Sequence, residues 1–189
     1  KAALLPAALL QWTGLDRLAE RWGLTSALPD VLQRMQRLLP QLRSREPRLP
    51  DRLPALGPRR ARVALFTGCV ADALFQHVNW ATARVLQANG CEVIGPQSQA
   101  GCGAIHYHSG AGEPALKLAQ QNAAAFDIDA IDAIIINVAG CGSMLKDYGH
   151  VGAELRPEDR AVSSQLDKFA RRVRDVHEFL AELGPIIPT

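Results

Sequence analysis

Short apolar runs alternate with longer amphipathic stretches over the C-terminal two thirds of the chain. The runs predict buried strands at 63–66, 91–94, 133–138 and 173–176. Apolar positions at helical spacing predict helices from 75 to 90, at 113–126, 157–170 and 177–183. Strands that alternate with helices indicate βαβ units. We therefore expect an α/β fold, a Rossmann-like open parallel sheet of about four strands.

The first sixty residues follow a different pattern and predict an N-terminal helical extension. Residues 15–22 read as one helix, and Pro29, at a favoured first helical position, opens a second that Pro40 kinks or ends. One face of this second helix carries apolar residues, namely Val31, Leu32, Met35, Leu38, Leu39 and Leu42. We divide the chain into a helical connector at 1–45, a Pro/Arg-rich extended linker at 46–61 with solvated arginines, and an α/β domain at 62–189.

Composition and charge narrow the functional classes. Basic and acidic residues number 21 and 19, giving a net charge of +2, which does not suggest a nucleic-acid partner. No apolar run is long enough to span a membrane. No predicted strand is followed by a glycine-rich phosphate-binding motif, whether Gly-x-Gly-x-x-Gly or Gly-x-x-x-x-Gly-Lys-Ser/Thr. No strand is followed by the nucleophile turn Gly-x-Ser-x-Gly either. The four cysteines do not resemble a disulfide scaffold, so we expect a reducing, cytoplasmic compartment.

Three of the four cysteines follow predicted strands. Cys69, Cys102 and Cys141 each come after a glycine, in loops behind the first, second and third strands. Because sites in open parallel sheets form at the carboxyl ends of the strands, we expect these residues to meet at one edge. Cys91 begins the second strand and is expected at the opposite edge, as a structural thiol.

The local sequence around these thiols leaves several chemistries open. Glycines allow close approach to a bulky group and free N–H groups for thiolate or sulfide, and a helix N-terminus beside Cys141 would favour its thiolate. His106 and His108 follow Cys102 closely and are candidate ligands or proton carriers, with His150 weaker. The alternative is that all three cysteines are buried structural residues.

The motifs together resemble a known family. They comprise residues 67–70, 101–108 and 139–142, with the run Lys-Asp-Tyr-Gly at 146–149 behind them. This set is similar to the cysteine-rich CCG domain, which occurs twice in the iron–sulfur subunit of glycolate oxidase and has relatives in heterodisulfide reductase. The resemblance covers residues 62–183 and is greatest to the first copy in the glycolate oxidase subunit. Residues 1–60 are similar to the helical connector of that subunit.

Two positions depart from the family pattern. Gly101 stands where the first cysteine of Cys-Cys-Gly is expected, and Met144 where the second cysteine of Cys-x-x-Cys is expected. Cys69, Cys102 and Cys141 are left for a cluster that normally uses four thiolates. A histidine, a solvent molecule or a cysteine from a second copy could supply the missing ligand, or the site could be degenerate.

The resemblance implies a role in electron transfer. It implies a piece of a subunit that carries electrons from a flavin-containing glycolate oxidase subunit through 4Fe-4S clusters towards the respiratory chain, with possible peripheral membrane association through the complex. A ferredoxin-like domain and a second CCG domain of the same parent chain are implied partners. This chain itself has no complete active site. Two alternatives stay open: a zinc site using the same cysteines with His106 or His108, and a metal-free interaction domain.

Overall fold

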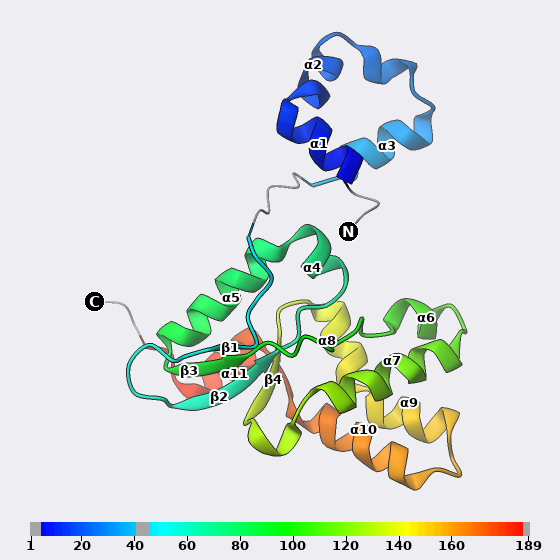
Figure 1. The fold of residues 1–189 in the computed structure, drawn as a ribbon. Helices are drawn as coiled ribbons and strands as arrows, with labels where there is room; N and C mark the ends of the chain where they lie inside the picture. Colours follow the sequence, from blue (N-terminus) through cyan, green and yellow to red (C-terminus); the bar gives the residue numbers. More distant parts are fainter. Residues whose placement is uncertain (1–4, 41–45, 187–189) are drawn as a thin grey trace.

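The computed structural model describes residues 5–40 and 46–186. Residues 46–186 contain a five-stranded sheet in the order β1-β3-β2-β4-β5 (Figure 1). The parallel strands are β2 (Ala61–Leu65), β3 (Cys91–Ile94), β4 (Ala133–Ile136) and β5 (Val173–Asp175), and β1 (Arg52–Leu53) pairs antiparallel with β3. The expected α/β class is confirmed, with the antiparallel edge strand β1 as an addition.

Side chains along each strand point alternately to the two faces of the sheet, and both faces are buried. Ala64, Phe66, Ile134 and Ile136 pack into one core under α7 (Gly112–Ala125), α8 (Ala139–Lys146), α9 (Tyr148–Leu155) and α10 (Arg160–Arg172). Val63, Leu65, Ala133 and Ile135 pack into the other, with residues from α5 (Gln76–Ala88) and α11 (Val176–Leu183). Both faces of the central strands are therefore covered by helices, which explains why these strands read as continuous apolar runs.

The predicted helices correspond to α5, α7, α10 and α11, with shifts at their ends. The helix expected from 157 begins at Arg160, because the Asp159 side chain caps it by accepting hydrogen bonds from the N–H groups of Ala161 and Val162. Short helices occur in addition at α4 (Val70–Leu74), α6 (Ala104–His108) and α9, together with a 3-10 turn at Ile128–Ala130. Of these, α4 directly follows Cys69, and α6 begins two residues after Cys102.

The stretch expected to be a linker with solvated arginines is in part ordered against the sheet. It contributes β1 and the buried Leu49, and the next strand begins one residue before the predicted boundary. The side chains of Arg52 and Arg59 are exposed, as expected, and both also pair with the carboxylate of Glu92, which is only 2% exposed. A carboxylate removed from water needs opposite charges nearby, and the arginines of the linker supply them.

The N-terminal residues form helices, as predicted, but without a buried core of their own. They are α1 (Leu5–Thr13), α2 (Leu15–Arg21), a 3-10 turn at Leu24–Ala27 and α3 (Asp30–Leu38), none of which has a buried residue. Pro29 is the residue before α3 rather than its first, and α3 ends ahead of Pro40. Leu42 lies outside the described residues. Across the described ranges, no helix is both long and apolar enough to cross a membrane.

Candidate functional site

A cavity of about 490 Å³ lies where the loops leave the carboxyl ends of the parallel strands, and three cysteines line it. Cys69 immediately precedes α4, Cys102 lies two residues before α6, and Cys141 is in the first turn of α8. His106 and His108 of α6 line the same cavity. The remaining lining consists of glycines and apolar side chains: Val70, Ala71, Gly101, Gly103, Ala104, Ile105, Leu118, Val138 and Gly140. The structure thus brings all five predicted site residues to one cavity.

The three thiols lie close to one another across the loops. A Cβ atom built on Gly68 would lie 3.9 Å from Sγ of Cys141, and one built on Gly101 would lie 3.5 Å from Sγ of Cys69. The thiol of Cys141 donates a hydrogen bond to the sulfur of Cys102. Each of the three thiols therefore lies next to a loop that carries another of these cysteines.

Charge is distributed unequally between Cys102 and Cys141. The hydrogen bond from Cys141 lowers the pKa of Cys102, against the effect of burial, and the N–H groups of Cys102 and Ala104 add to the shift. The pKa of Cys141 is raised, chiefly because its thiol is hydrogen-bonded to the sulfur of Cys102. Burial raises this pKa further, and a negative charge on Cys102 or Cys69 would repel a second thiolate at Cys141. The N-terminus of α8, which was expected to favour a thiolate at Cys141, does not outweigh these effects, and the pKa of Cys141 stays raised.

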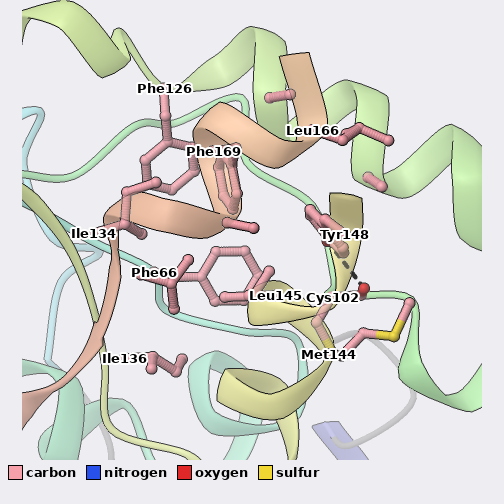
Figure 2. Packing of buried hydrophobic residues seen from close by; sticks show 14 of the residues in the cluster. Phe66, Cys102, Phe126, Ile134, Ile136, Met144, Leu145, Tyr148, Leu166 and Phe169 are labelled. Atoms are coloured by element: carbon pink, nitrogen blue, oxygen red, sulfur yellow. Dashed lines mark hydrogen bonds between the residues drawn. The ribbon is translucent and has the colours of Figure 1, made fainter. Parts of the chain in front are cut away.

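Two buried polar residues hold the backbone beside Cys102. The Tyr148 hydroxyl donates to the carbonyl of Cys102 at 2.9 Å (Figure 2). Asn122 donates to the carbonyl of Gly101 at 3.1 Å and to the Tyr148 hydroxyl at 2.9 Å, and it accepts from the N–H of Ala100 at 2.8 Å. Asn122 and Tyr148 are fully buried, so these hydrogen bonds fix the loop in a place that water does not reach.

A second pair of amides holds the chain that leads to Cys69. Gln99 accepts from the N–H of Thr67 at 2.9 Å and donates to the carbonyl of Leu65 at 3.3 Å. Asn79 of α5 donates to the carbonyl of Thr67 at 3.0 Å. Gly68 follows with a φ of 68°, a conformation that glycine adopts readily and that turns the chain into Cys69.

Cys91 and the remaining histidines are separate from the cavity. Cys91 is fully buried in β3 at the amino end of the sheet, as predicted, and burial raises the pKa of its thiol to about 11. His150 lies 4.0 Å from Glu154, and His177 contacts Asp175 at 3.0 Å. Neither lines the cavity, so the weaker candidate His150 is not part of the site.

The two departures from the family pattern have different surroundings. Gly101 lines the cavity beside Cys69, and its φ is not in the left-handed region, so a side chain there meets only ordinary contacts. Met144 is 4% exposed and belongs to the core under α8, rather than to the cavity lining. The position of the first missing thiol is therefore open, whereas the second is occupied by a side chain that fills the core.

The donor arrangement suits a cluster better than a single ion. Within residues 5–40 and 46–186, no three His, Cys, Asp or Glu side chains are grouped closely enough to hold one metal ion. A zinc ion needs its ligands about 2.0–2.3 Å from one point. An iron–sulfur cluster distributes its thiolates over separate iron atoms, so it suits thiols that line one cavity from three separate loops.

Comparison with known proteins identifies the class of domain. Residues 63–146 match the family described as "CCG: Cysteine-rich domain". These residues form a cysteine-rich domain of the CCG type, as the motifs suggested. No solved structure matches the chain.

The chain as a whole is similar to iron–sulfur subunits. It is 37% identical to the probable glycolate oxidase iron–sulfur subunit of Bacillus subtilis, over 97% of this chain and 41% of that protein. It is 35% identical to the glycolate oxidase iron–sulfur subunit of Escherichia coli, over 94% of this chain and 44% of that protein. Lactate utilization protein A of an Exiguobacterium species is 32% identical over 67% of this chain and 52% of its own length. The resemblance to the glycolate oxidase subunit is confirmed, and the chain spans less than half the length of those two subunits.

The residues that hold the site in place were not predicted from the sequence. Asn122 carries a usable signal, because it is an amide within the apolar face of the predicted helix 113–126. Tyr148 belongs to the motif at 146–149, but its contact with Cys102 depends on how α9 packs. No pattern in the sequence shows that the thiols of Cys102 and Cys141 lie within hydrogen-bonding reach of each other.

Proposed function

We propose that this chain is part of the iron–sulfur electron-transfer subunit of a 2-hydroxy-acid oxidoreductase such as glycolate oxidase. Cys69, Cys102 and Cys141 would bind an iron–sulfur cluster of the 4Fe-4S type in the cavity. The single observation that carries the proposal is that three thiols from three separate loops line one apolar cavity, while the fourth cysteine is excluded from it. The names of the most similar relatives support the same role.

The chain's own residues would bind the cluster and set its surroundings. Asn122 and Tyr148 hold the Cys102 loop in place from the core side, so this thiolate needs little rearrangement on binding. The apolar lining lowers the local polarity, and burial and hydrogen bonds to sulfur are among the factors that set the potential of a cluster. When bound, the cluster supplies one-electron transfer.

The chemistry on the 2-hydroxy acid would take place elsewhere. We place it on a flavin-containing partner subunit, with electrons passing through this chain towards the respiratory chain. A ferredoxin-like domain and a second CCG domain of the same parent chain would hold the neighbouring clusters, which is compatible with the span of less than half of the related subunits. The proposal assigns the protein to the cytoplasm, at the inner face of the membrane through its complex, where its free cysteines stay reduced.

The decisive experiment is metal and sulfide analysis of protein purified without oxygen, with a visible spectrum. We expect iron and acid-labile sulfide in equal amounts, with a broad brown charge-transfer absorption that is lost in air. Zinc without sulfide would replace the proposal by the structural-metal alternative. A folded chain with no metal would favour a metal-free scaffold, in which Gly101 marks a lost ligand.

A further inference from the structure

Three polar side chains form a network between the end of β4 and the helix α5. Asn137 directly follows β4, and its side-chain amide group donates to the amide oxygen of Asn79 at 3.0 Å and to the hydroxyl of Thr82 at 2.9 Å. Asn79 is fully buried and Thr82 is 8% exposed, and both belong to α5. The network therefore ties the end of a central strand to the helix that covers one face of the sheet.

The hydrogen bonds around Asn137 have a fixed direction. The hydroxyl of Thr82 donates its proton to the carbonyl of Val78 at 2.9 Å, so it can only accept from Asn137. The amide group of Asn79 donates to the carbonyl of Thr67 at 3.0 Å, which turns its oxygen towards Asn137. Position 137 thus has to supply two donors, which the N–H groups of asparagine do.

The oxygen of the same side chain is left without a partner. Oδ1 of Asn137 is buried and accepts no hydrogen bond from the residues that the structure describes. A buried acceptor without a partner lowers stability, so the use of this residue needs an explanation besides packing.

The network connects the segments that lead to two of the three cysteines. Thr67 lies two residues before Cys69, and Asn137 lies four residues before Cys141. Because Asn79 bonds to both Thr67 and Asn137, a continuous chain of hydrogen bonds runs from one segment to the other. The loops themselves are close, as the 3.9 Å between the Cβ position of Gly68 and Sγ of Cys141 shows.

The third cysteine is held separately. The hydrogen bonds of Asn122 and Tyr148 to the Cys102 loop come from α7 and α9, which cover the opposite face of the sheet from α5. No printed bond joins these two residues to the network of Asn137. The three cysteine loops are therefore divided into a linked pair and a single loop.

We propose that Asn137 is a positioning residue, which couples the Cys69 and Cys141 loops through Asn79 and keeps their two thiols at a fixed separation. Where it concerns retention of a cluster, this inference rests on the proposed function, since residues behind the ligands hold them in place for binding. The coupling of the two loops is a property of the metal-free chain and can be measured without iron.

The first test is amide hydrogen exchange of the metal-free chain, resolved by peptide mass spectrometry. The variants are Asn137→Ala and Asn137→Asp; the second keeps the size of the side chain while it removes both N–H donors, and it serves where Asn137→Ala does not fold. We expect exchange at residues 67–70 to be about tenfold faster in these variants, the factor that corresponds to the loss of one hydrogen bond. Exchange at 101–103 should not change.

The matched control is Thr82→Val. It removes the other acceptor of Asn137 but leaves the link from Asn137 through Asn79 to Thr67. We expect exchange at 67–70 to stay as in the unchanged chain.

The second test concerns retention of the cluster. Each protein is loaded with iron and sulfide without oxygen, and the release of iron to a ferrous chelator is followed. We expect release to be about tenfold faster in the two variants at position 137 than in the unchanged chain and in Thr82→Val, because loosened loops present their thiolates less steadily.

The outcomes separate the inference from the function on which it rests. Unchanged exchange at 67–70 in the variants at position 137, or equal acceleration in Thr82→Val, would overturn the coupling whatever the metal analysis shows. Acceleration that extends over α7 as well would be a general loss of stability and would also overturn it. Failure of the unchanged chain to bind iron and sulfide would overturn the proposed function, while faster exchange at 67–70 would still support the coupling. Faster exchange with unaltered iron release would overturn the role in retaining a cluster.

Discussion

The two ends of the parallel strands, which form the carboxyl edge and the amino edge of the sheet, give their polar and reactive groups opposite surroundings. At the carboxyl edge, Cys69, Cys102 and Cys141 lie beside an open cavity, and one of their thiols is exposed. At the amino edge, Cys91 is fully buried, and the neighbouring Glu92 is enclosed by arginines. The strands are shared, so the difference arises from the segments that flank them. Glycine-rich loops leave the carboxyl edge open, whereas the arginine-rich segment before β2 covers the amino edge.

The largest expected difference between the edges is in iron binding. Cys69→Ser, Cys102→Ser and Cys141→Ser should each lose most of the iron and sulfide, because each removes a thiolate that faces the cavity. Cys91→Ser should keep the full iron content and lose about 1–3 kcal/mol of stability, because it buries a hydroxyl in an apolar site. Metal analysis and chemical unfolding measure the two effects. Loss of iron in Cys91→Ser without unfolding would contradict the division into two edges.

The next largest effect concerns the carboxylate at the amino edge. Glu92 contacts Arg52, Arg59 and Arg62, and its side chain is almost fully buried. Glu92→Gln keeps the size but removes the charge, and we expect a loss of about 2 kcal/mol in the free energy of unfolding, since hydrogen bonds between charged groups are involved. The matched control is Asp167→Asn, which breaks an exposed pair with Arg171 and should cost about 0.5 kcal/mol or less. If both variants lose the same free energy of unfolding, the burial of Glu92 does not strengthen its ion pairs.

The same carboxylate predicts how stability depends on pH. Burial raises the pKa of Glu92, but hydrogen bonds from Arg62 and Arg59 and the charge of Arg52 outweigh it, so the pKa is lowered on folding. A lowered pKa stabilises the folded state above the unfolded value and loses this contribution as the pH falls through the folded value. We therefore expect the difference between the unchanged chain and Glu92→Gln to narrow between neutral pH and about pH 3. If the difference in stability between the two proteins does not change with pH, it arises from packing and not from the charge of Glu92.

The smallest expected change in stability comes from restoring a thiol at the carboxyl edge. Gly101→Cys should alter the unfolding free energy by no more than about 1 kcal/mol, because the backbone is not left-handed and the nearest atoms are at ordinary contact distance. Its Cβ would lie 3.5 Å from Cβ of Cys69, within the range of about 3.5–4.5 Å found in disulfides.

Without iron and under oxidising conditions, we expect this variant to form a disulfide with Cys69, which peptide mass mapping detects. Val70→Cys is the control, since it places a thiol elsewhere on the cavity wall. If the introduced thiol in Gly101→Cys stays free while Val70→Cys pairs with Cys69, then position 101 does not face Cys69 as described.

Much of the fold and part of the site follow from the sequence. Alternating strands and helices give the parallel sheet, and the rule that sites form at carboxyl edges places the three cysteines together. The edge strand β1 could not be predicted, because only two of its residues pair and prolines lie on both sides. The hydrogen bond between Cys102 and Cys141 depends on loop paths, and the contact of Tyr148 with Cys102 depends on the packing of α9. Neither carries a periodic signal along the chain.

The outer strands of the sheet have a consequence for how molecules behave at high concentration. β1 has two residues, with Pro50 and Pro54 beside it, and β5 has three residues with an arginine in the middle. Long, flat and apolar edge strands invite pairing with a second sheet, whereas short edges with proline or charge oppose it. Self-association through added strands is therefore disfavoured at both sides of the sheet, and light scattering of concentrated protein should show no growth of β-rich aggregates while the fold is intact.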